Sequence, residues 1–163
     1  MHWQLIAEAL RQELAEYGEL LRLFEQQQQS LFARDADAVL RIGGEIEGQA
    51  RILQDCRTRR EQAVSTFAKR VGQPGASTIR ALLDYVEAEA RPLLEALVNE
   101  VNHLLHRVRR TSRQNHAMLS RTLEIHQETL RQLRPDSFMK TYSSAGRVSV
   151  AATQATSALR VAG

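Results

Sequence analysis

One uninterrupted helical pattern, from Pro92 to Leu133, constrains the fold of this chain more than any other feature of its sequence. Apolar residues recur in it at spacings of three and four, which places them on one face of an α-helix. In the first half they are Leu94, Leu97, Val101, Leu104 and Val108. In the second half, Leu119, Leu123, Leu130 and Leu133 form what we call the second stripe, which we expect to be displaced around the helix. We expect the first face to serve the protein's own core and the second stripe to contact a partner.

The rest of the sequence is also helical in character, since its 163 residues include only 8 Gly and 3 Pro. It predicts an all-α fold, an elongated antiparallel helical bundle with coiled-coil-like packing of three long helices plus one short helix. The helices are expected over 3–33, 36–71, 78–89 and 92–134. They would make one bundle domain, 1–134, in which the final helix overhangs its neighbours.

The first helix carries an a/d heptad pattern typical of a coiled-coil-like interface. Its positions are Trp3, Ala7, Leu10, Leu14, Tyr17, Leu21, Phe24 and Leu31. Asp35 or Asp37 should cap the second helix, and Gly72 should end it in a left-handed conformation. Gly43, Gly44 and Gly48 lie inside the second helical pattern, where glycine is unfavourable. We favour close approach of a neighbouring helix as their reason, with a local bend as the alternative.

Beyond Pro135 the composition changes to Ser, Thr and Ala with few large apolar residues. Such a segment buries too little apolar surface to offset the entropy of ordering it. We therefore expect residues 135–163 to be a flexible, disordered C-terminal tail.

Cys56 is the only cysteine, which rules out an intramolecular disulfide and a cysteine metal cluster. It lies on the apolar stripe of the second helix, so we expect a buried thiol. The N-terminus has no secretory signal pattern and no stretch is apolar enough to span a membrane, so we expect a cytoplasmic protein.

The sequence offers little catalytic or metal chemistry. Glu100 and His103 form a Glu-x-x-His unit, but a di-iron bundle needs that unit on two helices and two further glutamates. There is no phosphate-binding glycine loop and no nucleophile elbow. We expect no cofactor, no metal, no small-molecule substrate and no enzymatic activity.

A basic run on the final helix comprises Arg107, Arg109, Arg110 and Arg113. The last three share a helix face that could touch phosphates or the acidic side of a protein partner. No aromatic residue is interleaved to stack on bases, so we expect no nucleic acid and favour a solvated face.

The C-terminal half carries a more specific pattern, which runs Arg113-Gln114-Asn115-His116-Ala117-Met118-Leu119 and continues through the second stripe to Pro135. The segment Thr141-Tyr142-Ser143-Ser144-Ala145-Gly146 follows in the tail. This arrangement resembles the FlgN family of flagellar type III export chaperones. The resemblance extends over the whole chain, with two long helices, a break, a long last helix and a tail with a tyrosine–glycine motif.

The resemblance implies a cytosolic chaperone that binds the C-terminal helices of hook-associated proteins, which form the hook–filament junction. Such a chaperone prevents their premature assembly and delivers them to the membrane export gate. The implied partner-binding residues are Asn115, Met118, Leu119, Thr122, Leu123, Leu130 and Leu133. Asn115 would set the register of the bound helix, and Tyr142 and Gly146 would belong to the contact with the export gate.

One alternative stays open at the level of sequence. The heptads of the first helix would also suit a homo-oligomeric coiled-coil scaffold or adaptor without a client, and the second stripe could close the protein's own bundle or a homodimer. Weak homo-oligomerisation is compatible with either reading.

Overall fold

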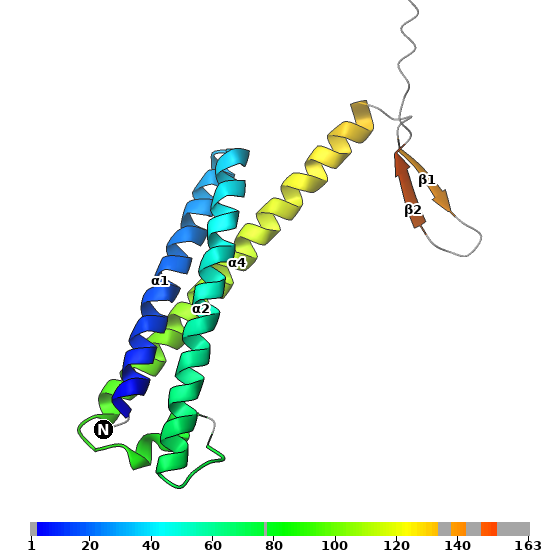
Figure 1. Ribbon diagram of the computed structural model, residues 1–163. Helices are drawn as coiled ribbons and strands as arrows, with labels where there is room; N and C mark the ends of the chain where they lie inside the picture. The colour runs from blue at the N-terminus through cyan, green and yellow to red at the C-terminus, as the bar shows by residue number, and fades with distance from the viewer. Residues whose placement is uncertain (1–2, 77, 134–137, 143–147, 153–163) are drawn as a thin grey trace, which may run out of the picture. The chain divides into compact units, whose positions relative to one another are not determined.

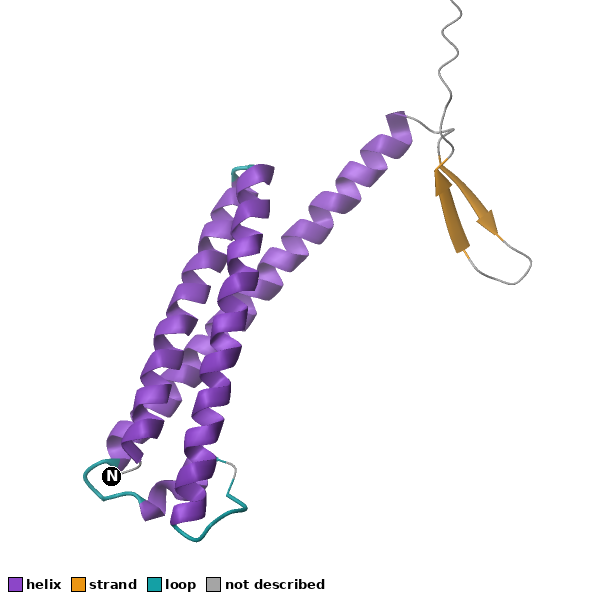
Figure 2. Cartoon of the chain, viewed as in Figure 1, coloured by secondary structure: helices purple, strands orange, loops and turns teal. Residues whose placement is uncertain are grey.

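A computed structural model describes residues 3–76, 78–133, 138–142 and 148–152 of the chain (Figure 1). The chain divides into two compact units, residues 1–117 and residues 118–163. The helices and strands are α1 (Trp3–Phe32), α2 (Ala36–Arg70), α3 (Ile79–Leu82), the 3₁₀ helix η1 (Leu83–Tyr85), α4 (Arg91–Leu133), β1 (Phe138–Tyr142) and β2 (Val148–Ala152). The predicted all-α bundle of three long helices is confirmed, and the predicted bounds of these helices differ from the observed ones by one residue at most (Figure 2).

The core of the first unit is formed by α1, α2 and the first part of α4, with α3 and Val86 closing it at one end. Helix α1 buries two adjacent sets of heptad positions because it packs against two other helices. One set is the predicted a/d pattern, in which Ala7, Leu10, Tyr17 and Leu21 are buried. The other set is a single row that repeats every seven residues and consists of Ile6, Glu13, Leu20 and Gln27, all buried. The apolar pattern of the sequence does not predict this second row, since two of its four members are polar.

The helix ends follow the predicted chemistry. Asp35 caps α2 by accepting a hydrogen bond from the backbone N–H of Ala38 at 3.0 Å. Gly72 ends α2 with φ 73°, and the N–H of Gln73 reaches the carbonyl of Ala68 at 2.8 Å, as in a Schellman motif. Arg34 takes the same left-handed role after α1 with φ 58°, a conformation that costs a non-glycine residue free energy.

The predicted short helix over 78–89 is shorter in the structure. Thr78 caps it, accepting from the N–H of Ala81 at 3.3 Å, but α3 and η1 together end at Tyr85. Val86 is extended, with ψ 147°, and its carbonyl accepts from Nε of Arg91 at 3.0 Å. The helix therefore stops because the Arg91 side chain, at the start of α4, binds the carbonyl groups that a continuing helix would use.

The interpretation of the α2 glycines as close-packing positions is wrong for two of the three. A Cβ atom built at Gly44 or Gly48 would meet nothing within 4 Å. At Gly43 the nearest atom would be Nε2 of Gln27, at the ordinary contact distance of 3.8 Å. These glycines leave space that a larger side chain could occupy, so packing does not require them.

In the second unit, β1 and β2 pair antiparallel in a hairpin, with Phe138 opposite Ala152 and Tyr142 opposite Val148. The sequence pattern predicts no secondary structure for this stretch. The prediction of a disordered tail otherwise falls on residues 135–137, 143–147 and 153–163, which lie outside the described part of the chain.

Candidate protein-binding site

The core-facing side of α4 is built on one strict heptad row. Leu94, Val101, Val108 and Asn115 follow one another at intervals of seven residues, and all four are buried. The next member of the row, Thr122, is exposed. Burial along this row therefore ends after Asn115.

A neighbouring row on α4 continues where the first one ends. Val98, Leu105, Ser112 and Leu119 also repeat every seven residues, and each is half-buried. A straight α-helix drifts about 20° per heptad relative to a seven-residue repeat, so an adjacent row gradually takes over the same side of the helix. The expectation that the second stripe is displaced around the helix is therefore wrong: Leu119 and its followers continue the same broad face.

The second stripe becomes exposed as it proceeds. Leu119 and the adjacent Met118 are half-buried. Leu123 is 60% exposed, Leu130 53% and Leu133 73%. Large apolar side chains at helical spacing on one exposed face are typical of a surface that binds another helix.

Asn115, the expected register-setting contact to a partner, is instead engaged inside the bundle. Its side-chain Nδ2 donates to the backbone carbonyl of Phe24 at 2.8 Å and to Oε1 of Gln27 at 3.1 Å. Only 1% of Asn115 is exposed, so a direct contact with a partner is not available in this structure. A single buried Asn at a heptad position fixes helix register, and here that register is the one between α4 and α1.

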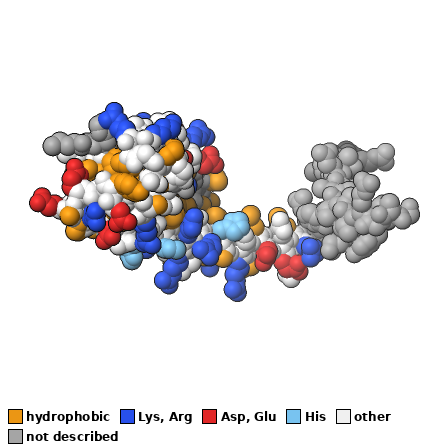
Figure 3. All heavy atoms as spheres, turned by 90° about the horizontal axis from the view of Figure 1, so that it is seen from below, with side chains coloured by type: hydrophobic (Ala, Val, Ile, Leu, Met, Phe, Trp, Pro, Cys, Tyr) orange, Lys and Arg blue, Asp and Glu red, His pale blue; other side chains and the backbone are white. Residues whose placement is uncertain are grey.

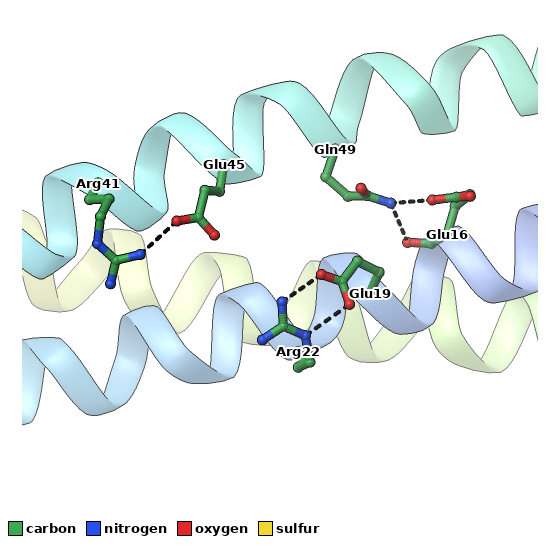
Figure 4. A network of polar contacts seen from close by, with 6 residues as sticks. All are labelled: Glu16, Glu19, Arg22, Arg41, Glu45 and Gln49. Carbon is green, nitrogen blue, oxygen red and sulfur yellow. Dashed lines mark hydrogen bonds and ion pairs between the residues drawn. The ribbon is translucent and has the colours of Figure 1, made fainter.

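Two further polar contacts connect α1 and α2. Nε2 of Gln49 donates to the backbone carbonyl of Glu16 at 3.2 Å and to its carboxylate at 2.5 Å (Figure 4). Nη1 of Arg60 lies 3.1 Å from Oε2 of Glu13. Nη1 of Arg60 donates a hydrogen bond to the other carboxylate oxygen of Glu13, Oε1, at 3.4 Å. Oε2 of Glu13 accepts no hydrogen bond among the described residues.

Burial raises the pKa of the Glu13 carboxyl above its ordinary value of 4.5, with Arg60 and then Arg57 opposing the rise. The carboxylate is almost fully removed from water, while Arg60 keeps partial access to solvent. The shift reflects the cost of desolvating a charge that one ion pair only partly offsets.

The buried polar side chains Glu13, Gln27, Gln49 and Asn115 are core residues that the sequence pattern does not predict. Their heptad positions are the signal that could have revealed them, since each stands where an apolar residue is expected. Gln27 and Asn115 share one layer through their hydrogen bond, whereas Glu13 contacts Arg60 and Gln49 contacts Glu16. These polar groups do not converge on one cavity as catalytic groups would.

Cys56 is buried, as predicted, and burial raises the pKa of its thiol. Among the residues that the structure describes, no three His, Cys, Asp or Glu side chains gather as a metal site would require. No helix in the described ranges is both long enough and apolar enough to cross a membrane.

The two residues expected at the export gate lie in the second unit. Tyr142 is the last residue of β1. Gly146 lies outside the described residues.

An exposed apolar stripe along the longest helix of a bundle is a surface on which a partner helix can pack. The chain matches the FlgN protein family over residues 1–149, so it belongs to that family, a family of flagellar export chaperones. No individual curated protein and no solved structure matches it significantly.

Proposed function

We propose that this chain binds the C-terminal helices of hook-associated proteins in the cytoplasm, keeps them from assembling prematurely and delivers them to the membrane export gate. The observation that carries the proposal is the second stripe, because it continues the face that the first part of α4 uses for its own core. Membership of the FlgN family supports the general chaperone role.

The client helix would pack on α4 as α1 and α2 pack on its first part. Met118, Leu119, Leu123, Leu130 and Leu133 would supply the apolar contacts, with Thr122 beside them. Asn115 would act indirectly, by holding α4 in register with α1 up to the last buried layer. Tyr142 and Gly146 would contribute to docking at the export gate.

The main argument for the alternative, a homo-oligomeric coiled-coil scaffold, was the heptad pattern of the first helix. The heptad of α1 that suggested it is occupied within the protein's own bundle, where Ala7, Leu10, Tyr17 and Leu21 are buried. Self-association through the second stripe would remain as a competitor of client binding.

A capture experiment tests the proposal. C-terminal segments of the hook-associated proteins of the host are immobilised, and binding of this chain is measured by surface plasmon resonance. The variant Leu123→Asp/Leu130→Asp should lose capture, because a carboxylate at each position would have to be buried against the client.

The matched control places the same substitutions on exposed apolar residues of the first unit. Phe32 is 72% exposed and Leu40 76% exposed, so Phe32→Asp/Leu40→Asp should leave capture unchanged. Equal binding by the two double variants would sink the assignment of the site, and absence of binding by the unmodified chain would sink the proposed client.

A further inference from the structure

A second surface of α4 stands out by its charge. His103, His106, Arg110 and Arg113, here called the outer row, follow one another at spacings of three, four and three residues. Such residues lie in line on a helix, and all four are exposed on the side away from the buried Leu94–Val101–Val108 row. From Val101 to Leu123 the sequence contains no Asp or Glu. Arg and His side chains gather along α4 in Figure 3.

Four arginines elsewhere on the helix surfaces form ion pairs with a carboxylate of the same helix. Pairs of opposite charge three or four residues apart occur on each long helix, and they are Glu8–Arg11, Glu19–Arg22, Arg41–Glu45 and Glu128–Arg131. Figure 4 shows two of them. Within the outer row the residues at these spacings are all basic, an arrangement that is unfavourable for an isolated helix. The acidic Glu100 lies three residues before His103, at the end of the row.

Acidic side chains of the other helices neutralise little of this surface. Glu25 of α1 lies 3.5 Å from Nη2 of Arg107, at the border of the outer row. Among the described residues, no carboxylate forms an ion pair with Arg109, Arg110 or Arg113. Nε of Arg113 donates to the backbone carbonyl of Arg109, at 3.3 Å. The surface therefore retains positive charge and free guanidinium donors.

The chemistry of the row favours one kind of occupant. Helix α4 contains no Phe, Trp or Tyr, so it offers no platform for stacked bases. The outer row also has no large apolar side chain of the kind that anchors a helix in a lipid interface. Its cationic side chains recur at the helical period. Two of them are arginines, whose planar guanidinium groups can each donate two parallel hydrogen bonds to one carboxylate.

We propose that the outer row binds an acidic α-helical segment of a partner protein, whose Asp or Glu side chains recur at the same spacings of three and four residues. The outer row shares no residue with the second stripe. This interaction is separate from the binding of a client, so a variant can lose it and still bind the client.

The test uses the full chain and two synthetic probes. Both are alanine-rich peptides long enough to be helical in water, with equal numbers of glutamates. In one probe the glutamates recur at the spacings of the outer row, and in its isomer they are spread evenly around the helix. Binding is followed by fluorescence anisotropy, and the helicity of both probes is checked by circular dichroism.

The in-line probe should bind at least about tenfold more tightly than its isomer, and more weakly as salt is added. Arg110→Glu/Arg113→Glu should abolish this preference. The control Arg51→Glu/Arg59→Glu makes the same change of charge at exposed positions of α2 and should retain it.

Three results would overturn the proposal. The first is that the two probes bind equally well, or that neither of them binds. The second is an unchanged preference in Arg110→Glu/Arg113→Glu with circular dichroism like that of the unmodified chain. The third is tighter binding, at matched charge concentration, to a short duplex DNA or to vesicles of phosphatidylcholine and phosphatidylserine than to the in-line probe.

Discussion

The side-chain amide of Asn115 on α4 donates to the side-chain oxygen of Gln27 on α1 across 3.1 Å. This contact forms the last buried layer of the heptad row of α4, since Thr122, one heptad further, is exposed. Both residues are polar and both are buried, so the layer depends on their pairing with each other and with the carbonyl of Phe24. A buried donor or acceptor that loses its partner costs free energy.

Asn115→Ala should therefore lower the free energy of unfolding by about 2 kcal/mol, because it deletes both hydrogen bonds and leaves Oε1 of Gln27 without this donor. Urea denaturation followed by circular dichroism measures the change. His116→Ala, at the exposed next position, should change the free energy by less than about 0.5 kcal/mol. Similar losses in the two variants would contradict a stabilising role for the layer.

The α2 glycines provide a prediction of the opposite sign. Because a Cβ at Gly44 or Gly48 would meet nothing within 4 Å, Gly44→Ala and Gly48→Ala should each raise the free energy of unfolding by about 0.5–1 kcal/mol. Gly72→Ala should lower it, since Gly72 has φ 73°. Thermal unfolding of the three variants checks the signs, and destabilisation by Gly44→Ala would mean that α2 needs its glycines for another reason.

Substitutions in the second stripe should separate binding from folding. Leu123 and Leu130 are 60% and 53% exposed, so Leu123→Asp/Leu130→Asp should change the free energy of unfolding by less than about 1 kcal/mol. The buried comparison is Val101→Asp, which should unfold the bundle because the new carboxylate would lie in the core. Urea denaturation with matched circular dichroism distinguishes the two. Extensive unfolding of the double variant would show that the stripe belongs to the protein's own core.

The sequence predicts the helices of this protein well because their patterning is strong and their ends carry specific chemistry. Asp35, Thr78 and Gly72 mark ends through local hydrogen bonds and a positive φ, which depend on a few neighbouring residues. The short helix is shorter than its pattern predicts because its end depends on the Arg91 side chain, whose bond to the Val86 carbonyl is a tertiary feature.

The candidate site is only partly predictable. Exposure of Leu123 and Leu130 agrees with a partner-binding stripe, but burial of Asn115 cannot be read from its polar side chain. Glu13 escapes prediction for the same reason, since its heptad position indicates the core while its charge indicates the surface. Only the pairing of helices decides between the two, and periodicity in one sequence does not give that pairing.

Cys56 should be protected from thiol reagents. It is buried and burial raises the pKa of its thiol, so both access and the thiolate fraction are reduced. With Ellman's reagent at mildly alkaline pH, Cys56 should react at least about a hundredfold more slowly than a cysteine on the exposed surface of α2. The control is Gln54→Cys in a Cys56→Ser background, because Gln54 is exposed. Comparable rates would indicate frequent opening of the bundle near Cys56.

The buried ion pair of Glu13 and Arg60 predicts a pH dependence of stability. Burial raises the pKa of Glu13 in the folded chain, so the folded state binds this proton more tightly than the unfolded state does. The stability that this tighter proton binding contributes is fully present below the ordinary pKa of 4.5. It is lost as the pH rises through the raised pKa of Glu13 in the folded chain. Glu13→Gln cannot titrate and lacks this loss.

The difference in free energy of unfolding, unmodified chain minus Glu13→Gln, should therefore fall as pH rises from about 4 to about 7. Urea denaturation across that range measures it. Glu47→Gln, at an exposed position of α2, serves as the control, and its difference from the unmodified chain should show no such fall with pH. A difference that rises with pH would mean that Arg60 stabilises the Glu13 carboxylate by more than burial destabilises it.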